Sequence, residues 1–125
     1  MTPLRDVFEK LVRPPEEDRA ENLRRWAQHI GGTTRIADLQ ARKRACAAGV
    51  IRNIRIDPTE GTGTVEATFT DGTGQMVAKW LGRPSMAGIR LGVGIVVEGT
   101  PGMGEDNELV VLNPEYRLIP GPEHS

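Results

Sequence analysis

The sequence predicts a mainly β domain, a five-stranded, partly open Greek-key barrel preceded by two short amphipathic helices. Two observations lead to this prediction. From about residue 42 onward, runs of β-branched residues are separated by glycine-containing turns, whereas the first 34 residues carry apolar side chains at helical spacing. Five strands with an interruption after the third fit the Greek-key barrel, and an SH3-like barrel is the second choice. We therefore expect a helical leader at 1–34, the barrel at 35–120 and a short tail at 121–125.

The leader contains two predicted helices. Apolar residues that recur three and four positions apart form the stripe of the first: Leu4, Val7, Phe8, Leu11 and Val12. Pro14 ends this helix and Pro15 begins the second, because proline lacks an amide donor but suits the first helical position. The second stripe, closed by Gly31-Gly32, contains Leu23, Trp26, Ala27 and Ile30. Both stripes need to be covered, either by the barrel of the same chain or by a partner chain.

The clearest signal in the barrel is a β-hairpin. Residues 65–70 alternate apolar and polar side chains, and Asp71-Gly72 then forms a tight turn, because glycine reaches positive φ without a Cβ penalty. The chain returns through residues 76–81. The other strands are expected at 50–56, at 93–99, and at 108–112 with a continuation to about Ile119, while residues 83–89 are interpreted as a loop or one helical turn.

Composition narrows the function classes. Sixteen Lys plus Arg against seventeen Asp plus Glu give a net charge of −1, which argues against a broad nonspecific DNA-binding surface. Cys46 is the only cysteine, so it has no internal disulfide partner, and we expect it to be a small core residue. No apolar run suggests a signal peptide or a membrane span, and we expect a cytoplasmic protein without membrane contact.

An enzymatic function finds little support in the residues. The histidines are His29, at a helix end, and His124, in the tail, so neither lies near a candidate nucleophile. The glycine runs at 61–63 and 72–74 lack the Gly-Lys-Ser/Thr ending of a phosphate-binding loop. Metal-ligand spacing is absent as well. We therefore expect no catalysis, no cofactor and no metal.

Several short motifs resemble the OB-fold nucleic-acid-binding domain family. They are Gly49-Val50-Ile51-Arg52, Asp71-Gly72-Thr73-Gly74, Lys79-Trp80-Leu81-Gly82, the strand over 92–99 and Asn113-Pro114-Glu115-Tyr116. The chain looks most like the small stand-alone OB proteins of actinobacteria, which also carry a short acidic helical leader. The hairpin with its aromatic strand also resembles OB domains of tRNA synthetases and of a branch-migration helicase. The β resemblance covers residues 42–119 and implies the fold, with binding of single-stranded DNA or RNA as the expected function.

The resemblance also implies a location for the binding site. OB domains bind single strands across the face of strands two and three, between the loops that join strands one to two and four to five. Transferred to this chain, the predicted binding residues are Arg42, Lys43, Arg44, Arg52, Arg55, Lys79, Trp80 and Arg83. Trp80 is the candidate stacking platform. Adjacent strand residues point to opposite faces, however, so without a bulge Lys79 and Trp80 do not share the groove, and a packed Trp80 is the alternative.

Two hypotheses remain open from the sequence. The first is a non-catalytic nucleic-acid-binding module that uses the face of strands two and three. The second is an interaction or assembly module in which residues 4–30 mediate self-association or docking to another protein. The net charge and the scarcity of aromatic residues favour the second hypothesis, whereas the fold and the Arg42-Lys43-Arg44 run favour the first. The first hypothesis gains if six cations share one face: Arg35, Arg42, Arg44, Arg52, Lys79 and Arg83.

Overall fold

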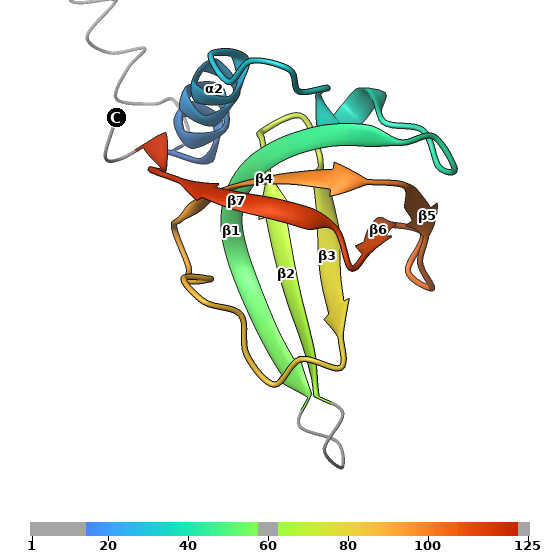
Figure 1. The fold of residues 1–125 in the computed structure, drawn as a ribbon. Helices are drawn as coiled ribbons and strands as arrows, with labels where there is room; N and C mark the ends of the chain where they lie inside the picture. The colour runs from blue at the N-terminus through green and yellow to red at the C-terminus, as the bar shows by residue number, and fades with distance from the viewer. Residues whose placement is uncertain (1–14, 58–62, 123–125) are drawn as a thin grey trace, which may run out of the picture.

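The computed structural model describes residues 15–57 and 63–122 (Figure 1). The predicted first helix, at residues 4–12, lies outside the described residues. The elements are helix α2 (Pro15–Gln28), a 3₁₀ turn η1 (Ile36–Asp38), and strands β1 (Ala45–Asp57), β2 (Thr64–Thr70), β3 (Gln75–Leu81), β4 (Gly94–Gly99), β5 (Pro101–Met103), β6 (Leu109–Leu112) and β7 (Glu115–Ile119). The prediction of a second helix beginning at Pro15 and of a mainly β body is confirmed.

The described strands form one curved sheet in the order β5-β6-β3-β2-β1-β4-β7 (Figure 1). Within the described residues this sheet has seven strands, which corrects the prediction of a partly open barrel of five. The predicted strand at 93–99 corresponds to β4, and the short strand β5 follows it after Thr100, where no strand was predicted. The predicted strand at 108–119 is divided by Asn113-Pro114 into β6 and β7. Asn113 is left-handed, with φ 48°, and Pro114 has no amide hydrogen, so the ladder is interrupted there.

Strand β1 connects the two halves of the sheet. Its first half pairs with β4 and its second half with β2, both antiparallel, whereas β3 and β6 run parallel. The strand bends where Gly49 approaches the neighbouring strand: a Cβ there would lie 2.7 Å from the Phe69 ring and 2.8 Å from the carbonyl oxygen of Thr70. A side chain at position 49 would collide with β2, which requires glycine there. Strand β1 begins at Ala45 rather than at the predicted residue 50.

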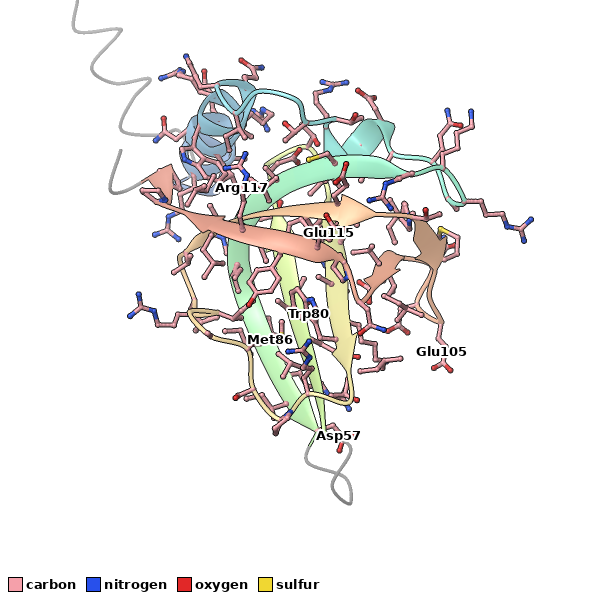
Figure 2. The ribbon with its side chains drawn as sticks, in the orientation of Figure 1. Asp57, Trp80, Met86, Glu105, Glu115 and Arg117 are labelled. Carbon is pink, nitrogen blue, oxygen red and sulfur yellow. The ribbon has the colours of Figure 1, made fainter. Side chains whose placement is uncertain are left out.

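The core lies inside the curve of the sheet (Figure 2). The alternation predicted for β2 is confirmed, since Val65, Ala67 and Phe69 are buried. The connection between β3 and β4 forms a loop, as predicted, and its Met86 and Ile89 pack against the core. Burial of these side chains provides the main driving force for this fold.

Helix α2 packs on the sheet of its own chain. Leu23 is 3% exposed, and the remaining residues of the predicted stripe, Trp26, Ala27 and Ile30, are half-buried. The sheet therefore covers Leu23 fully, while Trp26, Ala27 and Ile30 keep part of their surface exposed. The proposed domain boundaries at residues 34 and 120 stay a prediction.

Candidate nucleic-acid interface

The outward face of β1, β2, β3 and β6 carries the first group of predicted binding residues. The strand registers align Arg55, Glu66, Lys79 and Leu112 in one row across this face. Lys79 Nζ lies 3.0 Å from Glu66 Oε1, and the two side chains are 34% and 25% exposed. The Lys79 charge is therefore partly neutralised before any ligand binds.

Arg83 joins this group at the end of β3. Its amide donates a 2.9 Å hydrogen bond to the carbonyl oxygen of Gly63, at the start of β2. The amide of Leu81 donates to Asn113 Oδ1 at 2.9 Å, which holds the end of β3 against the β6–β7 junction. Because of these contacts, Arg55, Lys79 and Arg83 lie at the same end of the β1–β2–β3 sheet. We call this group the sheet-face cations.

Trp80 belongs to the core, which corrects its interpretation as an exposed stacking platform. Its side chain is 4% exposed, and its Nε1 donates a 3.1 Å hydrogen bond to the carbonyl oxygen of Pro114. Its ring also meets Tyr116 edge to face, with centroids 5.2 Å apart. Lys79 and Trp80 are adjacent in a regular strand and so face opposite sides. No base can stack on a ring that is enclosed in this way.

The triplet Arg42-Lys43-Arg44 lies at the opposite end of β1 from Arg55. Arg42 has a left-handed backbone, with φ 72°, and its amide donates to the carbonyl oxygen of Pro101 on β5 at 2.8 Å. Arg44 forms an exposed 3.5 Å ion pair with Glu98 on β4. The triplet is thus separate from the sheet-face cations, and one of its charges is partnered.

Arg52 lies at a β-bulge in β1 and belongs neither to the triplet nor to the sheet-face cations. The register between β1 and β2 shifts between Ile51 and Asn53, and Arg52 is the extra residue. A bulge redirects side chains. Arg52 lines a hollow beside α2 together with Arg19 and Leu23, three residues before Arg55 and on the same outward side of β1. The six cations that would favour nucleic-acid binding by sharing a face are therefore dispersed, and Arg35 is paired with Asp38 at 2.8 Å.

The hollow beside α2 was missed by the sequence analysis. It measures about 610 Å³ and adjoins a second hollow of about 600 Å³, because Arg19, Leu23 and Arg52 line both. The remaining residues of the first are Asn22, Arg25, Trp26, His29 and Pro122. One signal was present: Arg19, Asn22, Trp26 and His29 recur at intervals of three and four, which places them along one side of a helix.

The part of the chain that the structure describes shows few signs of metal binding, membrane insertion or a reactive nucleophile. Among residues 15–57 and 63–122, no group of three or more His, Cys, Asp or Glu side chains could hold a metal ion. Nor does any helix there have the length and apolar character needed to cross a membrane. Burial raises the pKa of the Cys46 thiol, and the nearby Glu98 carboxylate adds to this effect while Arg117 opposes it. Such a thiol is a weak nucleophile at neutral pH.

Comparison with known proteins shows the fold. No protein-family model and no curated protein matches this chain. RecG, in a structure bound to a three-way DNA junction, is 17% identical with a TM-score of 0.58, over 71% of this chain and 13% of the RecG chain. A replication protein A heterotrimer bound to ssDNA contains a chain that is 22% identical with a TM-score of 0.50, over 73% of this chain and 68% of that one. These likenesses establish an OB-fold-like β architecture, and the resemblance to stand-alone actinobacterial proteins stays a prediction.

Proposed function

We propose that this protein binds single-stranded nucleic acid on the outward face of β2 and β3 and catalyses no reaction. The observation that carries the proposal is the position of Arg55, Lys79 and Arg83 at one end of the β1–β2–β3 sheet. The sheet itself has the fold of chains that were solved in complexes with DNA. Arginine and lysine side chains contact phosphates and position a strand without reading its sequence.

The chemistry of this face favours weak, sequence-tolerant binding. Thr68 on β2 provides a hydroxyl group, whereas the Thr70 hydroxyl donates to the carbonyl oxygen of Gly74 at 2.7 Å. The exposed Leu81 and Leu112 are 47% and 56% accessible. Aliphatic side chains provide apolar contact for a base but less stacking than an aromatic ring. Most of the affinity would therefore come from the phosphates, and it would fall as salt rises.

The test is fluorescence anisotropy of labelled single-stranded DNA and RNA of about 16 nucleotides at about 50 mM and about 200 mM salt. The variant Lys79→Gln/Arg83→Gln should weaken binding and reduce the salt slope by about 0.7 for each phosphate contact that is lost. The matched control Arg35→Gln/Arg90→Gln removes the same charge from exposed cations elsewhere. Absence of binding at low salt, or an equal loss in both variants, would refute the sheet-face site.

The alternative function, an assembly module acting through residues 4–30, now rests on the predicted stripe at residues 4–12. Exposed Leu81 and Leu112 add an apolar area that a protein partner could also cover. Analytical ultracentrifugation of the full chain tests this function. A concentration-dependent dimer that Phe8→Gln/Leu11→Gln abolishes would support it, and a monomer at all concentrations would exclude self-association.

A further inference from the structure

We propose that the hollow between α2 and β1 is a second contact site for the same single strand, in which Arg19 and Arg52 bind phosphate and the Trp26 ring packs on a base. This inference rests on the proposed function and extends its site beyond the sheet face. We call the two adjoining hollows the α2 groove. Its walls are α2 on one side and the β1 bulge and the β2–β3 turn on the other.

The α2 groove has fixed walls. Leu23 is buried against the sheet, and Arg24 Nη1 donates a 3.1 Å hydrogen bond to the carbonyl oxygen of Gly72 in the β2–β3 turn. These contacts hold α2 at two points, one apolar and one polar. A preformed groove binds a ligand without first ordering its own walls, which lowers the entropic cost of association.

Trp26 is held in position at the edge of this groove. A Cβ at Gly94 would lie 2.8 Å from Trp26 Cζ2, so the ring is in close contact with β4 at a position that has no side chain. The ring is half-buried and lines the first hollow. An aromatic ring with one edge fixed and another part accessible can pack against a nucleobase, which enclosed Trp80 cannot do.

The charge of the groove is positive. Arg19 and Arg52 are exposed and line both hollows, and none of the described residues that line them is acidic. Arg25 contributes less, because it forms a 3.4 Å ion pair with Glu21. A first hollow of about 610 Å³ lies within the range of small-ligand sites. Cationic side chains beside an aromatic ring are the combination that binds single strands.

The groove is continuous with the sheet face. The second hollow is lined by Thr70 and Gln75, which are paired at the end of β2 and β3, and by Arg52. Arg52 and Arg55 are three residues apart on β1, roughly 10 Å in an extended strand. A single strand that crosses the sheet-face cations therefore meets the groove when it continues toward α2. OB folds bind about 4–16 nucleotides, so the groove should affect only the longer ligands.

The experiment compares fluorescently labelled oligo(dT) of about 6 and about 16 nucleotides by anisotropy, using the full chain. For Arg19→Gln/Arg52→Gln we expect about tenfold weaker binding of the longer ligand and unchanged binding of the shorter one. The control is again Arg35→Gln/Arg90→Gln, and circular dichroism checks that each variant folds. If both ligands bind and the groove variant equals the control, the inference is wrong while the proposed function stands. If neither ligand binds to the unaltered protein, the proposed function fails as well.

Photocrosslinking provides a second readout, which reports contact between a side chain and a base rather than the charge of the groove. Oligonucleotides carrying 5-iodouracil are irradiated in the complex, and mass spectrometry locates the crosslinked residue. We expect crosslinks at Trp26 and none at Trp80, which is 4% exposed and acts as an internal control. Crosslinks confined to residues of the β2–β3 face would overturn the role of Trp26.

Discussion

The Arg24 guanidinium donates a hydrogen bond from Nη1 to the carbonyl oxygen of Gly72 at 3.1 Å and so joins α2 to the β2–β3 turn across 48 residues of sequence. Gly72 has φ 85°, and a Cβ on it would lie 2.6 Å from the carbonyl oxygen of Ala20. The Asp-Gly turn therefore has two roles. It reverses the chain between two strands, and it leaves the space that the helix occupies.

We expect Gly72→Ala to lower the free energy of unfolding by more than Gly92→Ala does. Both glycines have φ 85°, but nothing lies within 4 Å of a Cβ at Gly92, whereas a Cβ at Gly72 meets α2. Backbone strain alone should cost about 1–2 kcal/mol in each variant, and displacement of the helix should add about 1 kcal/mol or more at Gly72. Urea denaturation measures both, and equal losses would show that α2 does not depend on this contact.

Trp80→Ala should destabilise the protein by about 3–5 kcal/mol, because it removes a buried ring from the core and leaves a cavity. Trp80→Phe should cost less, since it keeps an aromatic ring against Tyr116 and loses the hydrogen bond to Pro114. Chemical denaturation ranks the two variants. An unchanged unfolding midpoint in Trp80→Ala would contradict the position of this residue in the core.

Asp71→Asn should destabilise the protein by about 1–3 kcal/mol, because the NH2 group of the new side chain would face the hydrogen-bond donors from which the carboxylate accepts. The carboxylate is 3% exposed, and it accepts hydrogen bonds from the amides of Ile36 and Thr73, each at 2.9 Å. It also accepts from Thr73 Oγ1 at 2.6 Å. Asp106→Asn, in an exposed loop, is the control. Thermal unfolding should separate the two variants, and similar melting temperatures would argue against this network.

Cys46 should react slowly with iodoacetamide, with a pH midpoint above that of an ordinary thiol. Burial raises the pKa of the thiol first, the Glu98 carboxylate raises it further, and Arg117 lowers it. We therefore expect Glu98→Gln to lower the midpoint and Arg117→Gln to raise it. Since the folded-state pKa is raised, the associated stability is present below the unfolded pKa and is lost as pH rises through the folded one. Alkylation rates measured against pH test the order of the three proteins.

Glu66→Gln should strengthen nucleic-acid binding, because the Lys79 ammonium then no longer has the carboxylate at 3.0 Å as a competitor for phosphate. A partly exposed pair of this kind is worth at most about 1 kcal/mol, so the gain should be at most about fivefold. The same anisotropy titration measures it. Weaker binding in Glu66→Gln would mean that the pair holds Lys79 in the productive position.

The local elements were predictable because their causes lie close together in the chain. Proline at position 15 begins α2, and the alternation over Val65 to Phe69 sets the inward face of β2. The positions of the binding residues were harder to predict. Arg52 and Arg55 are three residues apart on β1, a spacing that places side chains on opposite faces of a regular strand. The bulge between Ile51 and Asn53 adds one residue, so both arginines are exposed on the outward side while Ile51 and Ile54 face the core. Nothing in a stretch of β-branched residues marks where such a bulge falls.

The hairpin, the start of the helix and the mainly β character of the protein follow from backbone preferences over a few neighbouring residues, so they can be predicted from the sequence. Such local preferences do not specify that Trp80 is enclosed, that Trp26 lines a groove or that the predicted cations separate into distinct groups. Those outcomes depend on which strands pair and on where α2 packs. Such contacts join residues far apart in the chain, so their geometry is set by the packing of the whole domain.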